Sequence, residues 1–263
     1  MKDQLNRTIE LKDTPKRIIS LVPSQTELLC DLGLESSLVG ITKFCVHPHH
    51  LLSHVAVVGG TKHVHYDKIK ALHPDIILCN KEENTQEMIV ELEKIAPVHL
   101  SDIYNIEDCL ELIGMYGILF SVENKAEEIV STIKNEQQQF QEFIKDQPKL
   151  KTVYFIWKKP WMVAANNNFI DALLSVGKFE NHFQDLERYP EIELEKDIDD
   201  TVDVIMLSTE PFPFKEPHVE AMKMKFPKAK VLLVDGELFS WYGSRLAKSF
   251  QYFKMLRLES LIG

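Results

Sequence analysis

The longest uninterrupted amphipathic stretch of the sequence covers residues 124–146, which contain neither Gly nor Pro. Its apolar residues recur at helical spacing, at Ala126, Ile129, Val130, Ile133, Phe140, Phe143 and Ile144. Asn124 is placed to cap this helix and Pro148 to end it. From 125 to 146 the helix would be about 33 Å long. Two interpretations follow: a long surface helix, or a helix that connects two lobes.

Predicted strands and helices alternate on both sides of this helix. Before it, we predict strands at 8–11, 17–21, 38–41, 55–58, 75–79 and 98–100, and helices at 24–32, 66–72, 85–95 and 106–120. After it, we predict strands at 152–157, 162–165, 204–207 and 231–234, and helices at 169–176, 217–226 and 244–261. A capping box that starts at Ser24 is expected to open the first helix.

This alternation is typical of mostly parallel sheets covered by helices. We therefore predict the α/β class, with two lobes joined by a single long α-helix. The expected division is an N-terminal lobe at 1–120, a linking helix at 121–150 and a C-terminal lobe at 151–263.

A short internal repeat favours two related lobes. Asp67 lies eight positions before Asp75, and Glu195 lies eight positions before Asp203. In both cases a Lys follows the first acid, and the Asp opens an apolar strand. Chance is the alternative explanation, because these residue types are common.

Composition limits the functional class. The net charge of −10 and the absence of a basic stripe argue against nucleic-acid binding. No apolar run is long enough to cross a bilayer, and no charged-then-apolar leader is visible, so these features alone predict a cytoplasmic protein that is not membrane-embedded. Cys30, Cys45, Cys79 and Cys109 lack CxxC spacing and are expected to be buried thiols in a reducing compartment.

Ligand contacts in open α/β sheets come from loops beyond the carboxyl ends of the strands. These loops supply the candidate ligand-binding residues Ser24, Gln25, Phe44, Cys45, Thr61, Lys62, Trp157, Trp241 and Tyr242, together with residues 82–84 and 212–214. All three Trp residues of the chain lie in or beside such loops. Aromatic side chains would suit a flat macrocycle or planar chelate. The alternative is that the Trp side chains pack where the lobes meet.

Histidines are concentrated in one part of the sequence, at His47, His49, His50, His54, His63 and His65. With Cys45 they could form a metal site or supply an axial ligand to bound cobalt or iron. The candidate ligands are His47 and His63. The alternative is ordinary surface histidines, since the spacing matches no closed zinc pattern.

Two segments, RIISLVPSQTELLCDLGL at 17–34 and VVGGTKHVHYDKIKALHPDIILCN at 57–80, together with the single long helix, carry a family resemblance. The chain resembles the cobalamin-binding branch of the periplasmic-binding family with a helical backbone. Members of that family deliver cobalamin, haem or iron–siderophore complexes to ABC importers. The resemblance implies Rossmann-like lobes with the ligand between them, little hinge motion, a monomer without an intrinsic cofactor, and a location in the periplasm or cell envelope.

The resemblance also assigns roles to individual residues. Asp67 and Glu195 match the acids that meet arginines of the permease. Tyr189 matches an aromatic residue that faces the ligand, and Thr61 stands where the cobalamin binder has a Trp.

The leading hypothesis is a substrate-binding protein that hands a corrinoid or related metal-chelate (cobalamin, haem or an iron chelate) to an ABC permease. It requires no catalytic residues, and the GxSxG, GxGxxG, P-loop and HExxH motifs are absent. The alternative is a cytoplasmic enzyme or chaperone of tetrapyrrole metallation, similar to chelatases. A third possibility is a regulatory binding module kept in the cytoplasm.

Overall fold

The computed structural model describes residues 1–261, and their contacts divide the chain into two units. Unit one comprises Met1–Ile103, Glu107–Ile133 and Tyr242–Arg245, and unit two comprises Tyr104–Ile106, Lys134–Trp241 and Leu246–Gly263. The predicted division treats the long helix as a separate segment between the two lobes. In the structure, the part of this helix up to Ile133 belongs to unit one, and the part from Lys134 belongs to unit two. Gly263, the predicted end of the second lobe, lies outside the described residues.

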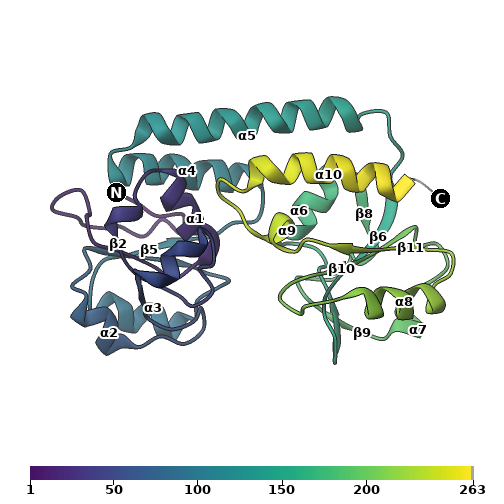
Figure 1. The fold of residues 1–263 in the computed structure, drawn as a ribbon, viewed down its shortest axis with the longest axis horizontal. Helices are drawn as coiled ribbons and strands as arrows, with labels where there is room; N and C mark the ends of the chain where they lie inside the picture. Colours follow the sequence, from purple (N-terminus) through teal and green to yellow (C-terminus); the bar gives the residue numbers. More distant parts are fainter. Residues whose placement is uncertain (262–263) are drawn as a thin grey trace. The chain divides into compact units, whose positions relative to one another are not determined.

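Unit one is built on a parallel sheet with the strand order β3-β2-β1-β4-β5 (Figure 1). Its strands are β1 (Ile18–Ser20), β2 (Leu38–Ile41), β3 (Ala56–Val57), β4 (Ile76–Asn80) and β5 (Val98–Ser101). The central strand is apolar and fully buried, because Ile18 pairs with Leu38 on one side and with Ile76 on the other.

The helices of unit one follow its strands, as predicted. They are α1 (Pro23–Asp31), α2 (Tyr66–Ala71), α3 (Gln86–Glu93) and α4 (Ile106–Phe120), with short 3₁₀ helices η1 (Glu35–Ser37) and η2 (His49–Ser53). One hydrophobic core of this unit joins Ile19, Ile77 and Leu92, which come from β1, β4 and α3.

Two local predictions in unit one are wrong. Val22 is the N-cap of α1 and Pro23 its first residue, so Ser24 lies inside the first turn and does not cap it. Proline suits that position because its fixed φ is already helical and it has no amide hydrogen to satisfy. The strand predicted at 8–11 is only an isolated bridge between Thr8 and Lys2.

Unit two contains a mixed sheet with the order β11-β10-β6-β7-β9, and β8 also pairs with β6. Its strands are β6 (Leu150–Trp157), β7 (Trp161–Val163), β8 (Phe179–Asn181), β9 (Glu191–Ile192), β10 (Val204–Ser208) and β11 (Lys230–Val234). Strands β6, β10, β11 and β8 run parallel, whereas β7 is antiparallel to β6 and to β9. The prediction missed β8 and β9, which are too short to show a clear pattern.

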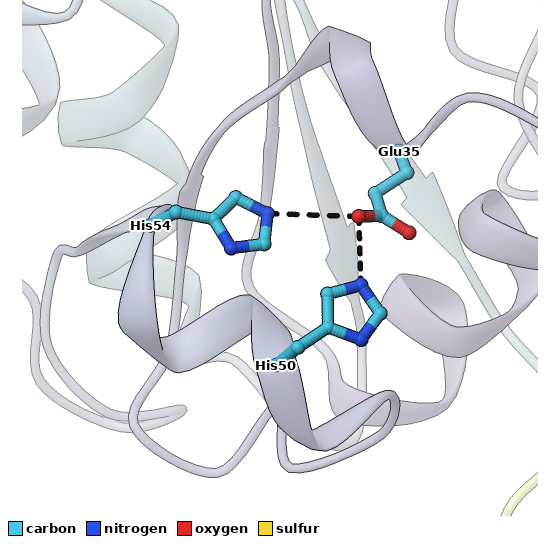
Figure 2. A group of neighbouring side chains, drawn as sticks. All are labelled: Glu35, His50 and His54. Carbon is cyan, nitrogen blue, oxygen red and sulfur yellow. Dashed lines mark hydrogen bonds and ion pairs between the residues drawn. The ribbon is translucent and has the colours of Figure 1, made fainter.

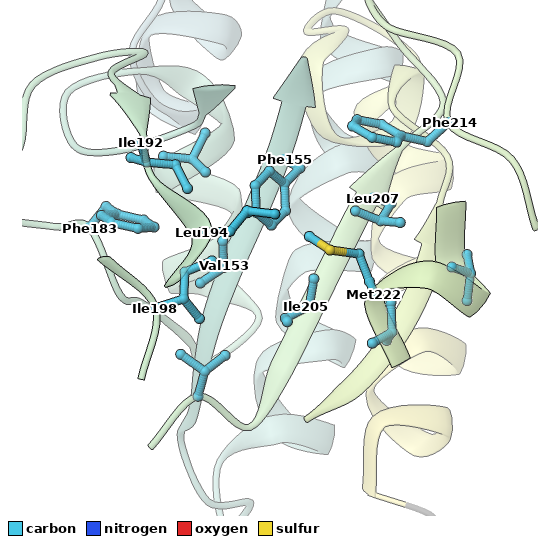
Figure 3. Packing of buried hydrophobic residues seen from close by; sticks show 14 of the residues in the cluster. Val153, Phe155, Phe183, Ile192, Leu194, Ile198, Ile205, Leu207, Phe214 and Met222 are labelled. Atoms are coloured by element: carbon cyan, nitrogen blue, oxygen red, sulfur yellow. The ribbon is translucent and has the colours of Figure 1, made fainter. Parts of the chain in front are cut away.

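The helices of unit two are α6 (Phe169–Val176), α7 (Leu194–Asp197), α8 (Glu216–Lys225), α9 (Glu237–Ser240) and α10 (Leu246–Leu261). Figure 3 shows how one face of its sheet is buried. Val153 and Phe155 of β6 lie beside Ile205 and Leu207 of β10, and Met222 of α8 packs onto them. The alternating residues of each strand therefore form one continuous core.

The long helix α5 (Glu123–Ile144) is unbroken, so the predicted helix is confirmed. It starts before Asn124, which therefore lies in its first turn and is not its cap. In unit one, Gly117 of α4 lets α5 approach closely: a Cβ built on Gly117 would lie 2.8 Å from Cβ of Ala126.

In unit two, the same helix packs on α10. The ring of Phe140 lies 6.0 Å from that of Phe250 and 6.2 Å from that of Phe253. The predicted fold class, two α/β lobes joined by one long helix, is confirmed. Within residues 1–261, none of the helices has the length and apolar character that a membrane span requires.

Candidate functional site

Three loops of unit one follow the carboxyl ends of the parallel strands β2, β3 and β4, at residues 42–46, 59–64 and 81–84. The second is a tight turn, in which the amide of Gly60 donates to the carbonyl of His63 at 2.7 Å. Gly59 has φ +139°, and a Cβ there would lie 2.5 Å from the same carbonyl oxygen. Only glycine fits this position without displacing backbone. The turn presents Thr61 and Lys62 at the carboxyl edge.

Side-chain hydrogen bonds join the second loop to the third. The amide of Asn84 donates to the carbonyl of Thr61 at 2.8 Å, and Nζ of Lys62 donates to the carbonyl of Glu82 at 2.6 Å. Oδ1 of Asn84 accepts from the backbone amide of Asn80 at 2.9 Å. Thr61 and Lys62 are therefore held in a defined position without a ligand.

The first loop exposes one aromatic ring. The side chain of Phe44 is 48% exposed, although its ring packs so closely on Gly60 that a Cβ there would lie 3.2 Å from it. Nζ of Lys43 lies 5.0 Å from the ring centroid, and the Lys43 amide donates to the carbonyl of Gly59 at 2.8 Å. Phe44 is thus a supported aromatic surface that a planar group could contact.

Cys45 has a different position from Phe44, because its side chain is buried. Its Sγ lies 3.1 Å from Oγ1 of Thr26 and 3.2 Å from Oγ1 of Thr42. Burial raises the pKa of this thiol. Cys45 therefore anchors the loop from within unit one.

Gln25 is fully buried at the centre of a polar network. Its amide donates to Oγ of Ser101 at 2.7 Å and to the hydroxyl of Tyr242 at 3.0 Å, and it accepts from the hydroxyl of Tyr116 at 2.7 Å. Burial raises the pKa of Tyr242, and Ser24 is buried beside it. The predicted ligand residues Ser24, Gln25 and Tyr242 are therefore buried in unit one below the carboxyl edge of the sheet. They support this edge, and their side chains are not on its surface.

Unit two has an aromatic cluster at the carboxyl ends of β6 and β10. The Trp157 ring lies 5.6 Å from Phe212, which lies 4.7 Å from Phe214. Trp161 stacks on Phe214 with centroids 6.1 Å apart and an interplanar angle of 9°. Trp157 is 38% exposed, whereas Phe214 is buried. The buried ring of Phe214 anchors the cluster in the core of unit two, and the ring of Trp157 is exposed to solvent.

Trp241, in contrast, is buried in unit two. Its Nε1 donates to Oε1 of Glu210 at 2.9 Å, and the hydroxyl of Ser240 donates to the same oxygen at 2.8 Å. Burial raises the pKa of Glu210. Trp241 therefore orders the loop that follows β10.

Tyr189 is half-buried next to a cation. The guanidinium carbon of Arg188 lies 5.6 Å from the Tyr189 ring and 5.9 Å from the Tyr104 ring. Tyr104 and Arg188 are not among the predicted ligand-binding residues. Tyr104 lies three residues after the end of β5, so the rule that selected the other loops would also have selected it.

The two predicted docking acids are exposed in their own units. Asp67 lies in the first turn of α2, and Glu195 in α7. Glu195 forms an ion pair with Lys225 of α8, and this hydrogen bond lowers the pKa of Glu195.

Within residues 1–261, the side chains that come together as a possible metal site are Glu35, His50 and His54 (Figure 2). The group does not include the predicted ligands His47 and His63. His47 packs against His49 instead, with ring centroids 5.0 Å apart.

Residues 18–231 match the model of the periplasmic binding protein family. The chain belongs to this family. Its members are binding proteins and not enzymes, so the predicted absence of a catalytic role agrees with the family. The chelatase-like alternative has no support from it.

Individual relatives agree with the family. An uncharacterized ABC transporter substrate-binding lipoprotein of Bacillus subtilis, YvrC, is 28% identical over 53% of this chain, and the match spans 45% of YvrC, or about half its length. The periplasmic vitamin B12-binding protein BtuF of Vibrio cholerae has a TM-score of 0.81 at 18% identity, with 95% of this chain and 99% of that chain covered. A periplasmic heme-binding protein of Pseudomonas aeruginosa has a TM-score of 0.80 at 21% identity, with 92% of each chain covered. These two structures share the fold.

Proposed function

We propose that this chain is the substrate-binding protein of an ABC importer, and that its ligand is a corrinoid or a related metal-chelate such as haem or an iron chelate. Support for the transport role comes from the family and from the lipoprotein relative in Bacillus subtilis. Support for the ligand class comes from relatives whose names state vitamin B12 and heme. The proposed location is outside the cytoplasmic membrane.

The observation that carries the ligand class is the exposure of aromatic rings at the carboxyl edge of each sheet. Phe44 is 48% exposed and packs on Gly60, and Trp157 is 38% exposed and packs on the ring of Phe212. Aromatic side chains bury much apolar area at a small cost in side-chain entropy. Such rings suit the flat face of a tetrapyrrole or of a planar chelate.

The surrounding groups suit the polar rim of such a ligand. Lys43 lies beside Phe44, Lys62 lies in the turn on which Phe44 packs, and Arg188 lies beside Tyr189. Cationic side chains could pair with the propionates of haem, or with the phosphate of cobalamin. We assign direct contacts to Phe44, Thr61, Lys62, Trp157 and Tyr189, and supporting roles to Ser24, Gln25, Cys45, Trp241 and Tyr242.

The test is an absorbance titration of the purified protein with cyanocobalamin, hydroxocobalamin and haemin in parallel. The proposal expects a saturable spectral change with one of them at a fixed stoichiometry and without turnover. Quenching of Trp fluorescence by an iron(III) siderophore extends the series to iron chelates. Absence of saturable binding to all of these compounds would overturn the ligand class, and metal insertion into free protoporphyrin would favour an enzyme.

A further inference from the structure

Two histidines and one glutamate, in or next to two short 3₁₀ helices, meet on the surface of unit one (Figure 2). Glu35 lies in η1, and His50 and His54 lie in and directly after η2. Oε1 of Glu35 lies 2.7 Å from Nε2 of His50 and 3.5 Å from Nε2 of His54. All three ligand atoms lie within 4.8 Å of one another.

These distances suit a small divalent cation. Bonds of about 2.0–2.1 Å in a tetrahedral arrangement place neighbouring ligand atoms about 3.3 Å apart. The two distances from Glu35 to the histidines, 2.7 and 3.5 Å, lie on either side of this value. Small rotations of exposed side chains would therefore admit an ion, and the backbone would not need to move.

The local structure brings both imidazoles together. His50 lies in the 3₁₀ helix η2, and His54 follows it as the C-cap, where the chain leaves the helix. The rings of His50 and His54 stack, with centroids 5.5 Å apart and an interplanar angle of 9°. Oγ of Ser53 lies 3.5 Å from Nδ1 of His54 and donates to the carbonyl of His50 at 2.6 Å. A hydroxyl beside Nδ1 favours the tautomer whose Nε2 lone pair faces the metal.

We propose that Glu35, His50 and His54 form a zinc-binding site. Two imidazoles and one carboxylate suit zinc and other first-row transition ions, whereas calcium and magnesium prefer all-oxygen sites. The three side chains are 38%, 55% and 50% exposed, so an ion can enter from solvent. With three protein ligands, the site leaves one position for water or an external donor.

No cysteine belongs to this group of ligand atoms within residues 1–261. Burial raises the pKa of Cys30 to about 12, and also raises the pKa of Cys45. Zinc binds the thiolate, and a raised pKa makes the loss of the thiol proton more costly, so these buried thiols are weaker zinc ligands than exposed ones. The site also uses none of the residues proposed to contact the chelate, and it can be tested without that ligand.

The experiment is a titration of the tag-free full chain with zinc chloride at pH 7.5, followed by calorimetry and equilibrium dialysis. We expect saturable binding that His50→Ala and His54→Ala each weaken at least about tenfold. Glu35→Gln should weaken it in the same direction. His63→Ala and His65→Ala are the matched controls, because these exposed histidines lie in the same unit outside the group, and they should keep the wild-type affinity.

A second readout identifies the ligands directly. Long-range ¹H–¹⁵N spectra should show the Nε2 resonances of His50 and His54 shifting together as zinc is added, while those of His63 stay in place. The proposal is overturned if the wild type shows no saturable uptake of zinc, or if the His50→Ala/His54→Ala double variant, with an unchanged circular dichroism spectrum, binds as the wild type does.

Discussion

Arg245 and Glu27 form a two-point ion pair inside unit one. Nε and Nη2 of Arg245 donate to the two carboxylate oxygens of Glu27 at 2.7 and 3.0 Å. Each side chain is only 9% exposed. Glu27 belongs to α1, so the pair fixes the segment Tyr242–Arg245 to the helix that follows the first strand.

Arg245→Met should therefore destabilise unit one markedly, because it leaves the Glu27 carboxylate buried without its guanidinium partner. Loss of one member of a buried pair costs about 3–5 kcal/mol. Urea unfolding followed by circular dichroism measures the change. Lys125→Met is the control, since it removes only an exposed pair with Glu128 and should change the stability far less. Equal effects of the two variants would contradict the structural role of Arg245.

Because His99 is buried, we expect the protein to lose stability in acid. His99 is fully buried in β5, and burial lowers its pKa from 6.5 to about 4. The unfolded chain therefore binds a proton at a higher pH than the folded chain, and the free energy of unfolding falls as pH decreases from about 6.5 to about 4. The lost stability is on the order of 3 kcal/mol.

The measurement for His99 compares urea unfolding at pH 7 and pH 4.5. His99→Leu should reduce the difference between the two pH values, while the exposed His63→Leu should leave it unchanged. If the wild type and His99→Leu lose the same stability between these pH values, His99 is not the responsible group.

Substitution of alanine for each of two glycines should change the stability of the protein in opposite directions. Gly59→Ala places a Cβ 2.5 Å from the carbonyl oxygen of His63 in a backbone with φ +139°, so we expect a loss of at least about 1–3 kcal/mol. Gly114 lies in α4 with no atom within 4 Å of its Cβ position. Gly114→Ala should stabilise the protein by up to about 1 kcal/mol, because alanine is the better helix former. Thermal unfolding of both variants tests the pair.

The exposed rings should contribute to ligand affinity and little to stability. Removing a ring that stacks on a ligand costs about 0.5–1.5 kcal/mol beyond its buried area, so Phe44→Ala and Trp157→Ala should each weaken chelate binding about tenfold. The absorbance titration measures this, with Ile118→Ala as control because Ile118 is 66% exposed on α4. Unchanged affinity in both aromatic variants would remove these rings from the site.

The proposed docking acids should affect the permease and not the ligand. Asp67→Lys combined with Glu195→Lys reverses two exposed charges, which should slow association with the importer and leave chelate affinity intact. Surface plasmon resonance at two salt concentrations measures the association rate. Glu142→Lys, a reversal on α5 at a carboxylate that is 72% exposed, is the control. A double variant that docks at the wild-type rate would exclude these acids from the interface.

Regular elements were the most predictable part of this fold. The strand at 38–41 and the helices at 106–120 and 169–176 have the predicted bounds, because each has a clear period and clear end signals. The repeat of Asp75 and Asp203 also has a physical basis. Oδ2 of Asp75 accepts from the amide of Arg17 at 2.9 Å, and Oδ2 of Asp203 from that of Lys151 at 2.7 Å, so each acid fixes the start of a neighbouring parallel strand.

The site was less predictable because long-range contacts decide it. The hydrogen bond from Gln25 to Tyr242 spans 217 residues, and no local pattern shows that both side chains are buried. The metal group illustrates the same limit. The four-residue spacing of His50 and His54 is visible in the sequence, whereas Glu35 joins them from a separate turn 15 residues before His50.

The four cysteines have a consequence for where the protein can work. All four are free; Cys45, Cys79 and Cys109 are buried, and burial raises the pKa of every one of them. Sulfhydryls that stay neutral and shielded react slowly with oxidants and with other proteins' disulfides. The free cysteines are therefore compatible with a location outside the reducing cytoplasm. The folded chain should tolerate an oxidising environment without forming disulfide crosslinks.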